Sequence, residues 1–303
     1  MNKIGEDVDR IQRIVNSAQE GEISPICAEL YPESSLDEFR KKLLDWLSPI
    51  DYAKLQSDTF HKRREGTGEW FLKSTPFVEW LEGTKKTLLC PGIPGAGKTI
   101  IASIVINHLK TSFPDDKTGR AYLYCIYKRQ DNQKANDLLA SLLGQLAARQ
   151  STVPWSIGKM YDEHRRKGEN SRLSLNEIRE GLHNIIKTYS RTFIVIDALD
   201  ECKTDGIRNE LLSEIYKLQE LEGSDTRLMV TFRPNVVLER PSGVTELEIL
   251  AHKEDVEEYL SGRMSDLPNV VQDDNELQYK IKAHILTLVD GMYVELHPLS
   301  LIY

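Results

Sequence analysis

The residues best suited to chemistry lie in one short segment, residues 92 to 99, which reads GIPGAGKT. Its glycines let the backbone curl so that successive amide groups point inward and bind an anion. A lysine at this spacing reaches the β- and γ-phosphates of a nucleotide, and the hydroxyl that follows it is a ligand for Mg²⁺. The segment fits G-x-x-x-x-G-K-[ST] in full, which favours a phosphate-binding loop over an ordinary strand-to-helix turn. The predicted nucleotide-binding residues are Gly92, Ile93, Pro94, Gly95, Ala96, Gly97, Lys98, Thr99 and Ile100.

A second group of candidate residues follows an apolar segment, TFIVID, that ends in Asp197. A carboxylate at the tip of a neighbouring strand is where the Mg²⁺ of a P-loop enzyme needs its second protein ligand. We therefore predict that Thr99 and Asp197 hold the metal. Asp200 and Glu201 come directly after, and either could polarise the attacking water. A solvated acidic turn is the alternative for any single carboxylate, but three of them beyond a P-loop favour the site.

Two further segments are less specific. Arg233 follows the predicted strand 227–232, where a polar residue could sense the γ-phosphate; a solvated arginine before Pro234 is the alternative. The segment HKRREGTGEW, residues 61–70, could cover the phosphates or the base, with Trp70 as a wall, but a basic run of this kind is more often a solvated surface. The guanine motif N-K-x-D has one near match, CKTD at 202–205, which lacks the asparagine. ATP or ADP is therefore favoured over GTP.

Length, charge and cysteine content exclude several classes of protein. The chain has 303 residues, enough to bury a sizeable core, and a net charge of −8, which argues against nucleic acid as its main partner. Its four cysteines lack metal-ligand spacing and indicate reduced, structural thiols. The N-terminus has acidic residues where a signal peptide needs an apolar run, and no segment is long enough to span a membrane. We expect a cytoplasmic protein with no membrane partner.

The elements that must position these residues are short strands and amphipathic helices that alternate from residue 87 onward. This pattern predicts a parallel sheet with helices on both faces, and ligands of such sheets bind at the carboxyl ends of the strands. Another strand lies in sequence between the two motif-bearing strands. We therefore expect a P-loop NTPase three-layer α/β sandwich of the extra-strand class. The predicted strands are 87–91, 121–127, 192–199, 227–232 and 245–250.

Helix signals complete this arrangement. Ser174 and Glu177 have the spacing of a capping box, and the apolar residues after them share one helix face. Leucine-rich periodicity predicts further helices around 138–146 and 207–218. The predicted organisation is a helical N-terminal segment at 1–48 (apolar stripes Ile4–Val15 and Leu36–Leu47), a linker or latch at 49–83 with a helix ending at Trp80, a nucleotide-binding domain at 84–265, and the helical start of a C-terminal lid at 266–303.

Taken together, these segments resemble the NACHT group of STAND nucleotide-binding switches, in particular the nephrocystin-type NACHT domain of fungal NLR-like and ankyrin- or WD-repeat proteins. The resemblance spans about residues 45 to 292. It is carried by SDTFHKRREGTGEWFL, LLCPGIPGAGKTIIASIVINHL, AYLYCIYKRQDNQKANDLLASLLGQL, FIVIDALDEC and VTFRP.

The resemblance implies roles for individual residues. Lys98 and Thr99 take the Walker A roles, and Asp197 takes the Walker B role. Asp200 and Glu201 supply the acidic pair after it, and Arg233 lies at the sensor position. It also implies exchange of ADP for ATP, opening, and assembly with other copies or NACHT-containing relatives. Slow hydrolysis then resets a signalling switch in an innate-immunity or incompatibility context.

The last residues depart from the family pattern. A winged-helix region and repeats should follow GMY, but the chain reads GMYVELHPLSLIY, so we expect a truncated or divergent segment after 294. Two other functions stay open. An AAA+-like remodelling ATPase would need an arginine finger from a neighbouring subunit, and its turnover would respond to DNA or unfolded protein. A non-catalytic scaffold or decoy would bind full-length relatives and stay small with ADP or an ATP analogue.

Overall fold

A computed structural model describes residues 33–128, 133–150, 153–168 and 171–288 of the chain. The predicted apolar stripe from Ile4 to Val15 and the segment after 288, with its divergent tail, lie outside the described residues. Within the described ranges, none of the helices is long and apolar enough to cross a membrane.

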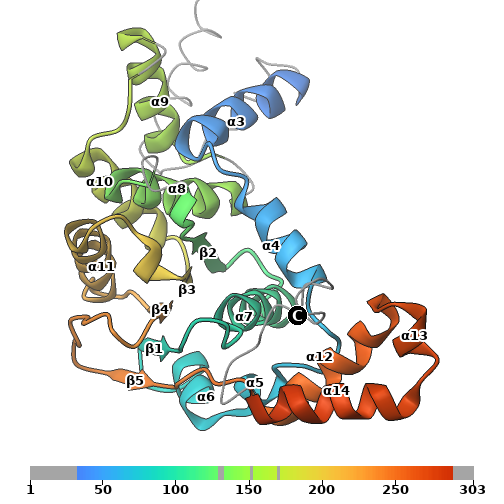
Figure 1. Ribbon diagram of the computed structural model, residues 1–303. Helices are drawn as coiled ribbons and strands as arrows, with labels where there is room; N and C mark the ends of the chain where they lie inside the picture. The colour runs from blue at the N-terminus through green and yellow to red at the C-terminus, as the bar shows by residue number, and fades with distance from the viewer. Residues whose placement is uncertain (1–32, 129–132, 151–152, 169–170, 289–303) are drawn as a thin grey trace, which may run out of the picture.

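The centre of the molecule is a parallel sheet of five strands in the order β2-β3-β4-β1-β5 (Figure 1). Each strand overlaps one predicted from the sequence, and the bounds of β1 match the prediction. β2, β3 and β5 end earlier than predicted, at Tyr124, Asp197 and Glu246. The strands are β1 (Thr87–Pro91), β2 (Thr118–Tyr124), β3 (Arg191–Asp197), β4 (Thr226–Phe232) and β5 (Val244–Glu246).

The strand that separates β1 from β3 is β4. β2 lies between the two motif-bearing strands in the chain and suggested the extra strand, but β2 pairs with β3 at the edge of the sheet. β4 pairs with both β1 and β3. The predicted fold class is thus confirmed, and the residues after β4 lie between the P-loop and the acidic turn.

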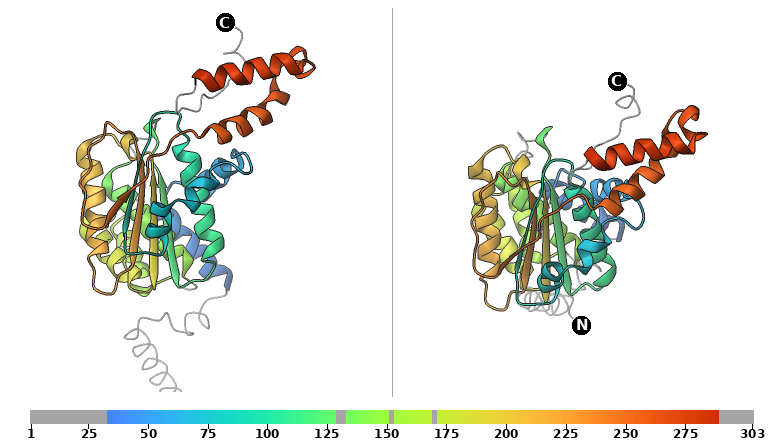
Figure 2. Two further views of the ribbon diagram at one scale, coloured as in Figure 1. Left: turned by 90° about the horizontal axis from the view of Figure 1, so that it is seen from below. Right: turned by 60° about the horizontal axis from the view of Figure 1, so that its bottom comes forward.

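Helices cover both faces of the sheet, which Figure 2 shows nearly edge-on. α7 packs on one face together with α6, and α8, α10 and α11 pack on the other. The leucines that predicted α8, Leu138, Leu142 and Leu146, are all buried. These helices are α6 (Thr75–Leu81), α7 (Lys98–Ser112), α8 (Ala135–Arg149), α10 (Leu175–Ile186) and α11 (Asp205–Gln219).

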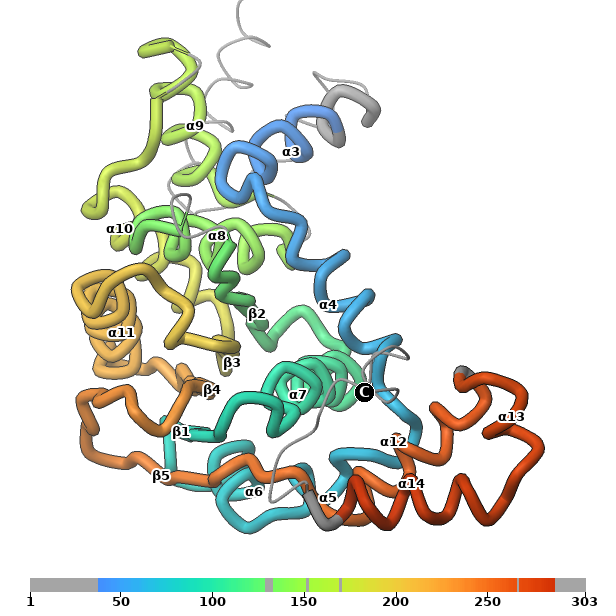
Figure 3. Tube along the Cα trace, in the orientation of Figure 1, coloured from blue at the N-terminus to red at the C-terminus, as the bar shows by residue number. Residues whose placement is uncertain are grey.

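The segment between residues 48 and 75 contains two helices that the sequence analysis did not predict. α4 (Tyr52–His61) packs on α7, and the short helix α5 (Glu69–Lys73) precedes α6. The buried side of α4 is partly polar, which hid its periodicity: Gln56 donates to the carbonyl of Ser103 at 2.9 Å and accepts from the hydroxyl of Tyr124. Figure 3 traces the chain from α3 (Glu33–Leu47) through α4 to α5.

Two apolar clusters form the interior. The larger one surrounds the sheet and includes Leu43 and Leu47 of α3. The smaller one joins α12 (Lys253–Arg263) to α14 (Asn275–Leu288) and consists of Val256, Leu260, Met264, Leu267 and Ile285. Val271 of α13 (Asn269–Gln272) is partly buried and packs against this cluster. The predicted domain boundaries remain a prediction. Among the described cysteines, Cys90, Cys125 and Cys202 are buried and form no disulfide.

The capping box predicted for α10 is present. The Ser174 hydroxyl accepts from the Glu177 amide at 3.4 Å, and the Glu177 carboxylate accepts from the Ser174 amide at 2.8 Å. We expect Ser174→Ala to lower the free energy of unfolding by about 1 kcal/mol, since an orphan amide at the helix start loses its acceptor. Urea unfolding at pH 7 measures this, and an unchanged midpoint would contradict it.

The same contacts make the stability depend on pH. Partial desolvation raises the pKa of Glu177, but hydrogen bonds from Ser174 and His164 outweigh it and lower the pKa from 4.5 to about 2. Because the pKa is lower in the folded state, this stabilisation is complete above pH 4.5 and is lost as the pH falls through about 2. Glu177→Gln should therefore flatten the stability profile in this acidic range.

Candidate functional site

The P-loop joins the end of β1 to the start of α7. Gly95 and Gly97 have φ of 77° and 90°, a left-handed conformation that glycine adopts without steric cost, and Gly97 is the N-cap of α7. The amide of Gly92 donates to the carbonyl of Phe232 at the end of β4, at 3.0 Å. The loop amides thus gather at the N-terminus of a 15-residue helix, where partial positive charge favours an anion.

Lys98 places its ammonium group over this loop. Its Nζ donates to the carbonyls of Gly92 and Ile93, at 2.8 and 3.0 Å. Burial lowers the pKa of Lys98, while the carboxylates of Asp200 and Asp197 raise it. The cation is thus held beside the loop by two carbonyls that a phosphate group can replace.

The two predicted metal ligands lie together. Asp197, at the end of β3, is 2% exposed and accepts a hydrogen bond from the hydroxyl of Thr231 at 2.6 Å, and the hydroxyl of Thr99 lies near enough to lower its pKa. Burial raises the pKa of Asp197 to about 6, although the hydroxyls of Thr231 and Thr99 and the charge of Lys98 act to lower it. A hydroxyl and a buried carboxylate are the hard oxygen ligands that Mg²⁺ prefers, and Mg²⁺ takes few ligands from protein. The donor set therefore fits this ion, although no group of three or more acidic, His or Cys side chains within the described ranges could hold a metal.

The acidic turn after β3 gives its two carboxylates different partners. Asp200 is paired with Arg233: its carboxylate accepts from the Arg233 amide at 3.1 Å and from the Arg233 guanidinium at 2.9 Å. The Glu201 carboxylate accepts from the amide of Tyr127 at 2.8 Å. Arg233 is thus not simply a solvated arginine, because the structure brings it to the acidic turn.

A cavity of about 650 Å³ brings most of these predicted residues together. The P-loop lines it from Pro94 to Ile100, facing Asp200, Glu201 and Arg233. Lys62, Arg63 and Arg64 also line it, with Trp70, although the sequence analysis favoured a solvated surface for this basic run. The cavity therefore combines backbone amides with several cations, as a polyphosphate site requires.

Residues of α12 form a part of this cavity that the sequence analysis missed. Asp255, Tyr259 and Arg263 line it. The carboxylate of Asp255 accepts from the amide of Gly68 at 2.9 Å and from the indole of Trp70 at 3.1 Å. In sequence, Asp255 is only an acidic residue in the first turn of a helix, which is common and carries no functional signal.

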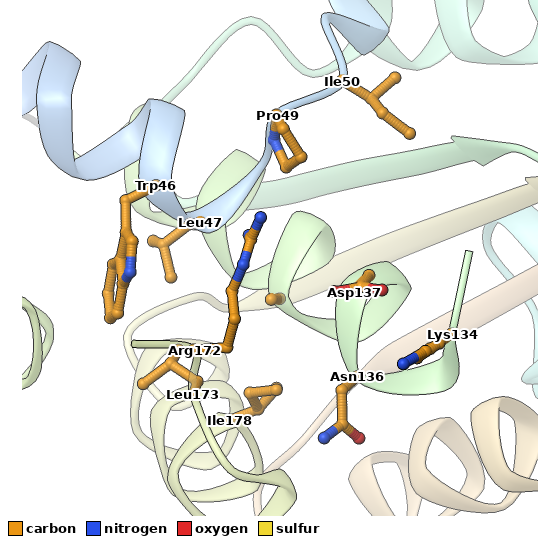
Figure 4. Close-up of a pocket in the computed structure, with 11 residues that line it drawn as sticks. Trp46, Leu47, Pro49, Ile50, Lys134, Asn136, Asp137, Arg172, Leu173 and Ile178 are labelled. Atoms are coloured by element: carbon orange, nitrogen blue, oxygen red, sulfur yellow. The ribbon is translucent and has the colours of Figure 1, made fainter. Parts of the chain in front are cut away.

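A second cavity, of about 730 Å³, lies between α3, α8 and the segment before α10 (Figure 4). Its walls mix apolar and charged side chains, among them Trp46, Asp137 and Arg172. None of the predicted site residues lines it. The two cavities are therefore distinct, and the phosphate-binding groups converge only on the first.

Comparison with known proteins agrees with this arrangement. The family model described as nephrocystin 3, N-terminal, matches residues 66–233, more than half of the chain. The chain belongs to the nephrocystin 3 N-terminal family. The resemblance predicted from the sequence is thereby confirmed, and membership supports nucleotide binding at the P-loop.

The chain is 25% identical over 239 residues to the vegetative incompatibility protein HET-E-1 of Podospora anserina, which covers 74% of the chain and 17% of the relative. The chain is similar to the Walker-type ATPase PABY2304 of Pyrococcus abyssi, with a TM-score of 0.46 and 16% identity, over 76% of this chain and 65% of that one. It is also similar to the structure of Aeropyrum pernix ORC1 in complex with DNA, with a TM-score of 0.44 and 20% identity, over 68% of this chain and 52% of that one.

Proposed function

We propose that this chain is a NACHT-type nucleotide-binding switch that binds ATP or ADP with Mg²⁺ and hydrolyses ATP slowly. One observation carries the proposal: the ammonium of Lys98, the hydroxyl of Thr99 and the buried carboxylate of Asp197 converge beside the P-loop amides. These are the groups that phosphate and its metal need at this spacing. Family membership supports the nucleotide, and the missing guanine motif favours adenine.

In this proposal the nucleotide phosphates lie on the amides of the P-loop. Lys98 exchanges its two carbonyl acceptors for phosphate oxygens. Thr99 and Asp197 hold Mg²⁺, which when bound neutralises charge on the phosphates. Glu201 orients the attacking water and accepts its proton, because the other carboxylate of the turn, Asp200, is neutralised by Arg233. The water oxygen bonds to the γ-phosphorus, the bond from that phosphorus to the bridging oxygen breaks, and ADP and inorganic phosphate are the products. Arg233 acts as the sensor of the γ-phosphate while its guanidinium stays paired with Asp200.

In this proposal the C-terminal helices respond to the nucleotide that is bound. They have an apolar cluster of their own, and α12 reaches the nucleotide cavity through Asp255, Tyr259 and Arg263. A group at this position can respond to the occupant of the cavity. We propose that ATP changes the position of these helices and allows assembly with another copy or with NACHT-containing relatives in the cytoplasm. The signalling context, like that of incompatibility proteins, is part of the proposal.

Isothermal titration with ATP and ADP, with and without Mg²⁺, tests this function. We expect saturable binding of both nucleotides, and tighter binding of ATP when Mg²⁺ is present, because Thr99 and Asp197 then contribute through the metal. GTP should bind more weakly than ATP. Absence of binding heat for both adenine nucleotides, with and without Mg²⁺, would overturn the proposal.

A further inference from the structure

A threonine that the sequence analysis did not single out connects the strands at the site. Thr231 lies on β4, is fully buried, and faces the end of β3. Its hydroxyl oxygen accepts from the amide of Ala198 at 2.9 Å and lies 2.6 Å from the carboxylate of Asp197. A backbone amide can only donate, and a hydroxyl has one hydrogen. That hydrogen is therefore directed at Asp197.

The backbone amide that donates to this hydroxyl belongs to Ala198, a residue with an unusual backbone conformation. Ala198 has a φ of 54°, the only positive φ at a non-glycine residue in the described part of the chain. Such a conformation is strained for an L-residue and persists only where its surroundings hold it. Ala198 begins the turn, and its carbonyl accepts from the amide of Glu201 at 2.8 Å. The hydroxyl of Thr231 thus fixes both the metal-ligand carboxylate and the start of the acidic turn.

We propose that Thr231 is a positioning residue for the nucleotide site, an inference that rests on the proposed function. Its hydroxyl holds the carboxylate of Asp197 in the orientation that faces Thr99, and it keeps Ala198 in the conformation that presents Asp200 and Glu201. Thr231 itself touches neither nucleotide nor metal. Two residues further on, Arg233 pairs with Asp200, so the end of β4 positions all three acidic residues of the site.

Burial of a threonine in this sheet does not by itself require such a role. Thr192, on β3, is 1% exposed, and its hydroxyl has no hydrogen-bond partner in the described part of the structure. It lies at the opposite end of the strand from Asp197. Thr192→Val is therefore a matched control, because it makes the same change at a buried position remote from the site.

The test compares Thr231→Val, Thr231→Ser and Thr192→Val with the wild-type chain. ATP is titrated at a series of Mg²⁺ concentrations, and ADP is titrated without Mg²⁺. Mg²⁺ increases the affinity for ATP, and for Thr231→Val we expect the Mg²⁺ concentration at half of this increase to rise about tenfold. A tenfold change is the usual effect of losing a hydrogen bond to a charged group. Affinity for ADP without Mg²⁺ should stay within about twofold, since the P-loop is unchanged. Thr231→Ser and Thr192→Val should behave like the wild type.

The outcomes separate this inference from the proposed function. If the wild type binds no nucleotide, both fail. If it binds nucleotide but Thr231→Val has the same Mg²⁺ dependence as Thr192→Val, only the role of Thr231 is overturned. If the wild type binds nucleotide with no Mg²⁺ dependence, the metal site of the proposed function fails together with the role of Thr231. Equal impairment in Thr231→Ser would assign the effect to lost packing of the methyl group and would also overturn it. Thermal unfolding checks each variant, and Thr231→Cys, a weaker donor, replaces the valine variant if that one does not fold; it should show the same rise in Mg²⁺ requirement.

Discussion

Replacing Lys98 with alanine should abolish measurable nucleotide binding, with a loss of affinity of at least about a hundredfold. Its ammonium already lies beside the P-loop, donating to two carbonyls, and would donate to two phosphate oxygens instead. Two hydrogen bonds to a charged group contribute about 3 to 6 kcal/mol, and every 1.4 kcal/mol is about tenfold in affinity. Titration with a fluorescent ADP or ATP analogue measures the loss.

The matched control for this variant is Lys110→Ala. Lys110 lies in the last turn of the same helix, α7, where it is exposed and 3.4 Å from the hydroxyl of Tyr122. The Lys110→Ala variant should leave the affinity for nucleotide unchanged, although it changes the composition of α7 and the net charge by the same amount as Lys98→Ala. Affinity of Lys98→Ala equal to that of the control would mean that the nucleotide, if bound, does not lie on the P-loop.

The second large effect is expected for Glu201→Gln, which should bind ATP normally but hydrolyse it at least about a hundredfold more slowly. Removing a general base costs a rate factor of about 10² to 10⁴. The amide side chain can still accept from the Tyr127 amide, so the turn should keep its geometry. Phosphate release under single-turnover conditions measures the rate, and Glu210→Gln, an exposed change on α11, is the control.

Asp200→Asn distinguishes the two acidic residues. Because Asp200 is paired with Arg233, we expect this variant to reduce the preference of the site for ATP over ADP more than it reduces the rate of hydrolysis. If Asp200→Asn stops hydrolysis while Glu201→Gln does not, the roles assigned to the two carboxylates are reversed. Strong stimulation of wild-type turnover by DNA or unfolded protein would favour a remodelling ATPase over a switch.

Local signals in the sequence were sufficient for the parts of the molecule built from neighbouring residues. The P-loop needs glycines, a lysine and a hydroxyl within eight positions, and the structure places them at the start of α7 as expected. The capping box of α10 depends on two residues three positions apart. Apolar runs located β1, β2, β3 and β4 because these strands are buried on both faces of the sheet. In each case one short segment determines the geometry, so its composition is enough to predict it.

The tertiary structure decided everything that depends on strands and helices meeting across the sheet. The position of β4 between β1 and β3 brings Thr231 to Asp197, residues 34 positions apart, and no periodicity within either strand encodes that pairing. The contact of Asp255 with Gly68 joins segments 187 positions apart. The buried face of α4 is partly polar and escaped a search for apolar periodicity. The sequence alone determines that this protein has a phosphate-binding loop on a parallel sheet. The packing of distant segments decides how the carboxylates are held and which C-terminal helix lines the cavity.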